Sequence, residues 1–185
     1  MNPLIDKLPS KIRVSDEICD INADYRTCLK IILAYEDDEL TMSEKHMILL
    51  NLLYKKMPKD IETAILQGIK FLDCGEQLKR NSNLKLYSFS KDAKYIYSAM
   101  SQVCHCDLED ISFLHWWKFC YYFLDISADS SFSNIIGLRQ KKAKGKLSKE
   151  EKEIYLKSRE IFDLDYSSEE TEEESGFMKI LNGGD

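Results

Sequence analysis

The sequence predicts a mainly α-helical fold, an irregular multi-helix bundle with one candidate β-hairpin near the N-terminus. Apolar residues recur at three- and four-residue steps along most of the chain after Ala23, the spacing of one helix face. Two Ser/Thr-x-x-Glu capping boxes, beginning at Thr41 and Ser148, mark helix starts. The composition, 44% hydrophobic and 31% charged over 185 residues, is that of a globular protein.

The first half of the chain divides into the hairpin and three helices. Residues 11–14 and 17–21 are β-type stretches joined by a short turn, which predicts a hairpin over residues 11–21. A first helix follows Ala23 and ends at the acidic turn 36–39. Thr41 opens a second helix, Pro58 suits the first turn of a third, and Gly75 closes it.

The second half predicts further helices joined by short breaks. Residues 84–89 alternate like a brief strand or extended lead-in, and Ser90 is a suitable N-cap for the next helix. Ser131 and Ser133 flank the start of another helix, which runs into the basic segment 139–146. Ser148 then opens a last helix that includes Phe162.

The densest apolar stretch predicts a central helix from Ile111 to about Ile126. At 100° per residue its expected core side is Phe113, Trp116, Trp117, Cys120, Phe123 and Leu124. The opposite side carries His115, Lys118 and Tyr122, which are candidate contacts for a partner. We therefore expect the tryptophans to be core residues, so that the main contact surface lies on other helices.

The folded domain is expected to cover residues 1–164. Residues 165–185 form an acidic tail with few core-forming side chains, and this composition predicts disorder. A short apolar stretch, residues 177–181, follows the acidic run. We hypothesise that acidic residues 169–174 fold back on the basic segment 139–146 and screen it when no partner is present.

Composition argues against several classes of protein. No apolar run approaches the ~20 residues that span a bilayer, and the N-terminus lacks the layout of a secretory signal, so we expect a cytoplasmic protein with reduced cysteines. The net charge of -6 argues against a dedicated nucleic-acid binder. Arg139, Lys141 and Lys142 could bind phosphate groups of a nucleic acid. The favoured interpretation is that they are cations at the solvated C-terminal end of a helix. All three are kept as candidates for binding a partner.

Catalytic and metal-binding patterns are weak. The seven glycines form no GxGxxG or P-loop pattern, and no nucleophile and base are paired, so we expect a non-enzyme without cofactors. Cys104, His105 and Cys106, with Cys74, Cys120 and His115 elsewhere, lack the paired spacing of a structural zinc site.

Four stretches of the second half resemble successive motifs of one protein family. They are residues 92–99, 107–108, 114–119 and 132–139, and the most specific parts are the His-Trp-Trp-Lys run from His115 and the Ile-Gly-x-Arg run ending at Arg139. In these stretches, and from the N-terminus to about Leu164, the chain resembles the bacteriophage gene-product-fifteen family. The acidic extension after Leu164 lies outside that pattern.

The resemblance implies a tail assembly chaperone of a long-tailed phage or prophage. Such chaperones are small proteins of the host cytoplasm that keep the tape measure protein soluble while tail tube subunits are recruited. The expected partners are therefore the tape measure protein and the tail tube protein, with self-association left open. The family supplies no catalytic or binding residues. The alternatives are a structural component of the finished tail and a small nucleic-acid-binding regulator.

Overall fold

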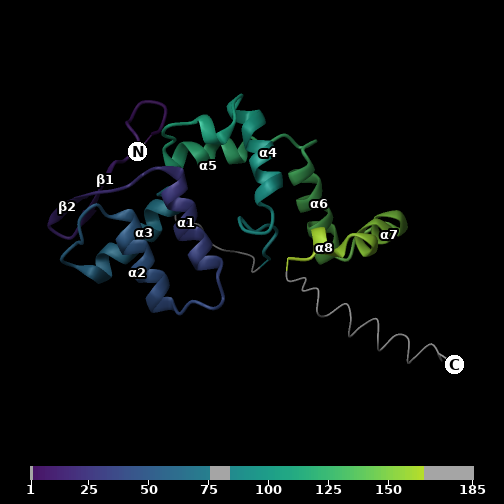
Figure 1. The fold of residues 1–185 in the computed structure, drawn as a ribbon, viewed down its shortest axis with the longest axis horizontal. Helices are drawn as coiled ribbons and strands as arrows, with labels where there is room; N and C mark the ends of the chain where they lie inside the picture. The colour runs from purple at the N-terminus through teal and green to yellow at the C-terminus, as the bar shows by residue number, and fades with distance from the viewer. Residues whose placement is uncertain (1, 76–83, 165–185) are drawn as a thin grey trace.

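Helices dominate the protein. The computed structural model describes residues 2–75 and 84–164, and within these ranges it has eight α-helices and one two-stranded hairpin. The prediction of a mainly α fold is confirmed. Figure 1 shows the hairpin with α1, α2 and α3 at one end, α6, α7 and α8 at the other, and α4 with α5 between them. The predicted acidic tail, 165–185, lies outside the described residues.

The N-terminal hairpin forms as predicted. Strands β1 (Lys11–Val14) and β2 (Glu17–Asp20) pair antiparallel, with Lys11 opposite Asp20 and Val14 opposite Glu17. Alternation along β1 buries Ile12 and Val14 on the side that meets α3. The hairpin therefore extends the helical core.

Three helices pack behind the hairpin. They are α1 (Tyr25–Glu36), α2 (Met42–Leu53) and α3 (Ile61–Leu72). The predicted capping box of α2 is present, since Glu44 N–H donates to Thr41 Oγ1 and Thr41 N–H donates to the Glu44 carboxylate. Pro58 is not in the first turn of α3 as expected, because Asp60 is the N-cap. Gly68 allows close packing, since a Cβ there would lie 2.7 Å from Leu49 Cδ2 on α2.

The second half contains the remaining helices. These are α4 (Ala93–Cys104), the 3-10 turn η1 (Leu108–Asp110), α5 (Trp116–Leu124), α6 (Ser131–Ala143), α7 (Lys149–Lys157) and α8 (Arg159–Phe162). Ser90 is not the N-cap of α4, because Asp92 takes that position. The capping box at Ser148 forms, but the single last helix of the prediction is two helices that meet at Ser158.

The central helix is shorter than predicted. It begins at Trp116, with His115 as its N-cap, because the preceding backbone is extended and pairs with the start of α1. Tyr25 N–H donates to the Leu114 carbonyl at 2.9 Å, and Trp116 N–H donates to the Ala23 carbonyl at 2.7 Å. A helix starting at Ile111 would lose both of these hydrogen bonds.

Burial along α5 confirms part of the predicted core and corrects the rest. Trp116 and Trp117 are buried, while Cys120 and Phe123 are partly buried against the same cluster. Phe113 and Leu124 are 60% and 82% exposed, so their assignment to the core is wrong. Phe113 precedes the helix, and Leu124 is turned about 100° from Phe123. The prediction also missed Phe119, which is 1% exposed.

The buried residues form two apolar clusters. The larger runs from the hairpin through α1–α5 to Phe132 at the start of α6, and the smaller contains Ile135, Tyr155 and Phe162. Tyr95 of α4 packs against both clusters. Within residues 2–75 and 84–164, no helix is long and apolar enough to cross a membrane.

Candidate interaction site

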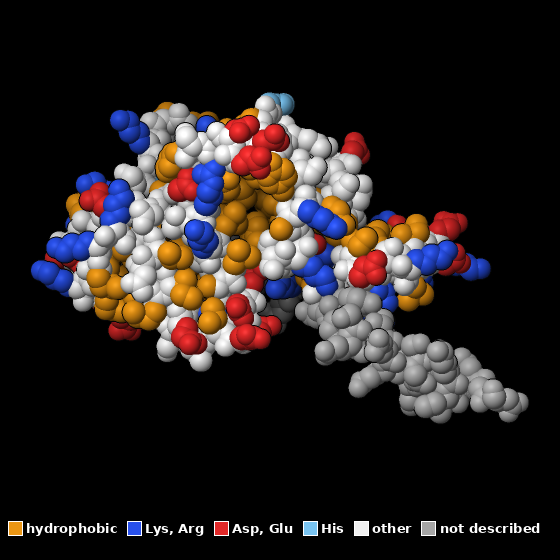
Figure 2. All heavy atoms as spheres, viewed as in Figure 1, with side chains coloured by type: hydrophobic (Ala, Val, Ile, Leu, Met, Phe, Trp, Pro, Cys, Tyr) orange, Lys and Arg blue, Asp and Glu red, His pale blue; other side chains and the backbone are white. Residues whose placement is uncertain are grey.

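An apolar hollow lies near the middle of the molecule. Figure 2 shows hydrophobic side chains gathered in it, and comparison with Figure 1 places it between α1 and α4. We call it the α1–α4 hollow. One side of α1 carries a stripe of residues at three- and four-residue steps. The stripe consists of Arg26, Leu29, Leu33 and Glu36.

The upper end of the hollow is closed by hydrogen bonds from α1 to the segment around η1. Arg26 Nη2 donates to the Leu108 carbonyl at 3.1 Å and also to the Ile111 carbonyl. The Tyr25 hydroxyl donates to the same Leu108 carbonyl at 3.2 Å. These contacts fix the N-terminal turn of α1 against the chain that leaves α4.

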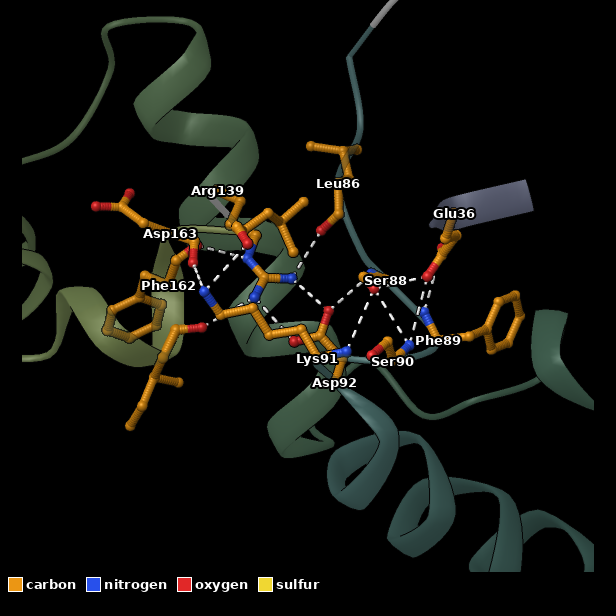
Figure 3. A network of polar contacts seen from close by, with 12 residues as sticks. Glu36, Leu86, Ser88, Phe89, Ser90, Lys91, Asp92, Arg139, Phe162 and Asp163 are labelled. Atoms are coloured by element: carbon orange, nitrogen blue, oxygen red, sulfur yellow. Dashed lines mark hydrogen bonds and ion pairs between the residues drawn. The ribbon is translucent and has the colours of Figure 1, made fainter. Parts of the chain in front are cut away.

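The lower end is closed by Glu36, at the other end of the stripe. Its carboxylate accepts hydrogen bonds from the Ser88 hydroxyl at 2.7 Å and from the backbone N–H groups of Phe89 and Ser90 (Figure 3). Next to them, Lys91 Nζ donates to the carbonyls of Asp163 and Leu164. Because Arg26 and Glu36 contact segments on either side of α4, Leu29 and Leu33 between them lie on the side of α1 that faces α4.

Aromatic rings pack between α1, α5 and the segment that precedes α4. Tyr25 of α1 stacks on Phe119 of α5 with ring centroids 5.1 Å apart, and the Phe89 centroid lies 6.5 Å from that of Phe119. Burial raises the pKa of Tyr25, whose hydroxyl donates to the Leu108 carbonyl in the segment that follows α4. Tyr97 of α4 contacts the same segment, since its hydroxyl donates to the Glu109 carboxylate at 3.3 Å. Leu33 and Tyr97 are each 38% exposed, so each leaves apolar surface in contact with water.

A buried ion pair joins the lower end of the hollow to the C-terminal helices. Arg139 is 5% exposed and binds Asp92 in a bidentate manner, Nη1 to Oδ2 at 2.6 Å and Nη2 to Oδ1 at 2.8 Å (Figure 3). The same guanidinium donates to three backbone carbonyls, which are those of Leu86, Ile161 and Phe162. Arg139 therefore connects the extended lead-in 84–89, α4, α6 and α8.

The His-Trp-Trp run has a structural use that the sequence did not reveal. His115 Nδ1 accepts the Trp117 N–H at 3.1 Å, and its other ring nitrogen lies 3.0 Å from the Pro9 carbonyl. Burial lowers the pKa of His115, which favours the neutral ring that this N-cap requires. The indole N–H groups of Trp116 and Trp117 donate to the carbonyls of Leu72 and Phe71 at 2.8 and 2.7 Å, so they cap the C-terminal end of α3.

A family model describes most of this structure. The model for the Bacteriophage Gp15 protein matches residues 4–164. The chain belongs to this family. The match confirms the resemblance found in the sequence and ends where the structure's described residues end. Comparisons with curated proteins and with solved structures found no match to this Gp15-family chain.

The predicted partner contacts of this Gp15-family chain are not brought together. Arg139 is buried, so its role as a surface contact is wrong in this structure. Lys141 pairs with Glu151, and Lys142 pairs with Asp163 and lies 4.4 Å above the Tyr155 ring. These lysines are at the end of α6. His115, Lys118 and Tyr122 belong instead to α5, where Lys118 lies over the Tyr122 ring at 5.4 Å.

Asp163 organises the end of α6 with the last helices. Burial alone would raise the pKa of this carboxyl group, but hydrogen bonds from Lys142, Tyr155 and Arg159 lower it to about 2. The cations of the basic segment thus hold the C-terminal helices in place. No sequence signal identified this use, because the partners are up to 21 residues apart.

The cysteines and histidines of the Gp15-family chain form no metal cluster in the described residues. The six cysteines, all within the described residues, form no disulfide, and Cys28 is completely buried. No group of three or more His, Cys, Asp or Glu side chains in the described residues could hold a metal ion.

Proposed function

We propose that this Gp15-family protein is a non-catalytic tail assembly chaperone. In this proposal it binds the tape measure protein, the tail tube subunits or both in the host cytoplasm while a long phage tail is built. Membership of a bacteriophage family supports the proposal, and so does the α1–α4 hollow. The hollow is the observation that carries it.

A chaperone for helical, apolar segments needs an exposed apolar groove on a stable body. Amphipathic helices bind such grooves through apolar side chains at three- and four-residue steps. Leu29 and Leu33 lie on α1 at this spacing, and Leu33 and Tyr97 of α4 are each 38% exposed. The hydrogen bonds of Arg26 and Glu36 fix α1 relative to the segments on either side of α4.

The proposal is tested by co-expressing the chain with segments of the phage's tape measure protein and with its tail tube protein. We expect a soluble complex with at least one of them. Leu33→Asp should weaken that complex about tenfold or more, because a charge in an apolar contact must be desolvated. Leu66→Asp is the matched control, since Leu66 is 63% exposed on α3, which packs against α2 and β1.

Two results would contradict the proposal. One is the absence of any complex with either protein, and the other is equal affinity of the Leu33→Asp and Leu66→Asp variants. Mass spectrometry of mature virions provides a further check. A chaperone should be absent from them, whereas a structural tail component would be present.

A further inference from the structure

We propose that the chain's own residues 177–181 occupy the α1–α4 hollow in the free protein. The acidic residues 169–174 would then lie along the cations at the lower end of the hollow. The tail would then compete with the partner protein for the hollow. This regulatory consequence rests on the proposed function. The docking itself concerns the isolated chain.

The composition of the segment matches the hollow. Four of the five residues between Phe177 and Leu181 are apolar, and an acidic run precedes them. On the side of α1 that faces α4, Leu33 is 38% exposed, and Tyr97 of α4 is exposed to the same extent. Burying such side chains is favourable by about 25 cal/mol for each Å² of apolar surface removed from water.

Leu164 lies near the lower end of the hollow, where Glu36 is bound. Leu164 is the last described residue, and its carbonyl accepts a hydrogen bond from Lys91 at 3.1 Å. Lys91 follows Ser90, whose N–H group binds Glu36 at the lower end of the α1 stripe. Leu164 therefore lies beside the lower end of the hollow.

The tether is long enough to reach the hollow walls. Phe177 lies thirteen residues after Leu164, and thirteen residues span at most about 45 Å. The stripe on α1 from Arg26 to Glu36 is only about 15 Å long at 1.5 Å per residue. A tether this short also gives an effective concentration in the millimolar range, so even a weak contact would be occupied.

Charge complementarity favours the same path. Beside Leu164, a cavity of about 450 Å³ is lined by cationic Lys85 and Lys142 together with Arg139 and Asp163. The acidic run begins five residues after Leu164 and carries five glutamates between residues 169 and 174. In the proposed path, the acidic run passes this cavity, where Lys85 lies near the ion-paired Lys142, before residues 177–181 reach the hollow.

Thiol labelling of the full-length protein tests the docking. Cys106, the exposed native cysteine, is first replaced by serine, and Leu33→Cys then places a reporter on the wall of the hollow. The rate of maleimide labelling at residue 33 is measured by peptide mass spectrometry. It is compared between the native tail and a Phe177→Ser, Ile180→Ser, Leu181→Ser variant.

We expect labelling about tenfold faster with the substituted tail, as for a site occupied roughly nine-tenths of the time by the native segment. A Leu66→Cys reporter on α3 is the matched control and should label at the same rate with both tails. Equal rates at residue 33 would overturn the proposal. Protection that increases with protein concentration would also overturn it, because the occupant would then be the tail of a second copy.

The test is independent of phage partners. Failure of the labelling prediction would leave binding of the tape measure protein unaffected. If labelling shows docking but no partner binds, the proposed function fails and the internal contact remains. The two proposals can thus be distinguished.

Discussion

Arg139 shows how far one residue's role can differ from its sequence context. It opens a run rich in lysine, yet it is buried and donates five hydrogen bonds to Asp92 and three carbonyls. Its lysine neighbours form ion pairs at the surface. The planar guanidinium can satisfy several acceptors at once, which a lysine ammonium in the same place could not do.

Arg139→Ala is therefore expected to destabilise the protein strongly. Truncation leaves the Asp92 carboxylate, which is 1% exposed, without its charged partner, and such a loss costs ~3–5 kcal/mol. Lys141→Ala removes an ion pair from a half-exposed side chain and should cost at most ~1 kcal/mol. Urea denaturation of both variants measures the difference. A cost below that of Lys141→Ala would contradict the assigned role.

Residue-level predictions succeeded where the signal was local. The capping boxes at Thr41 and Ser148 involve groups three residues apart, so the sequence contains the whole motif. Arg139 failed because its partner Asp92 is 47 residues away. Nothing in the spacing of two distant charged residues reveals that they meet in the interior.

At the scale of the element, α5 is fixed by what surrounds it. Its apolar pattern predicted a helix, which is present, but its first residue is set by backbone pairing of His115 with Asp24. That pairing explains why Phe113 is outside the helix. The indoles of Trp116 and Trp117 then reach the end of α3, a contact that the periodicity of α5 alone cannot specify.

Substitutions in α5 should separate its two sides. Trp117→Ala should cost ~3–5 kcal/mol through loss of packing. Trp117→Phe should cost ~1–3 kcal/mol, because it leaves the Phe71 carbonyl at the end of α3 without its indole donor. Leu124→Ala should change stability by less than ~0.5 kcal/mol, since Leu124 is 82% exposed. Thermal and urea unfolding of the three variants provide the measurement.

A different order of stability losses would contradict the assignment of buried and exposed residues in α5. If Leu124→Ala destabilised the protein as much as Trp117→Ala, Leu124 would be packed in solution. A Trp117→Phe variant as stable as the parent would show that the indole bond contributes little. These outcomes test the assignment of the buried side separately from the existence of the helix.

For the whole molecule, the mainly helical class and the hairpin were predictable because each follows from short-range periodicity. The hollow was not, because its walls come from α1 and α4, and the segments that close it are more than 50 residues from α1 in sequence. Which apolar side stays open depends on which helices pair. Sequence periodicity shows that a helix has an apolar side and leaves its neighbour undetermined.

The expectation of one folded domain over residues 1–164 leads to a whole-molecule prediction. The larger cluster spans the hairpin to α6, and Arg139 and Tyr95 link it to the smaller cluster. Unfolding should therefore be one cooperative transition. Tryptophan fluorescence reports α5, and hydrogen exchange in α7 reports the smaller cluster. Midpoints that differ between the two probes would show two independently folding parts.

The pairing of Asp24 with His115 also constrains the order of folding. Residues 23–25 exchange backbone hydrogen bonds with residues 114–116, about ninety positions later in the chain. During synthesis, α1 and α3 emerge long before the segment that completes them, so the apolar surface facing α5 stays exposed to water. Contacts of such large sequence separation slow folding. A nascent chain stopped before Trp116 therefore lacks the indole donors that cap the end of α3. The fold of α1 and α3 can be completed only after residues 114–117 have left the ribosome.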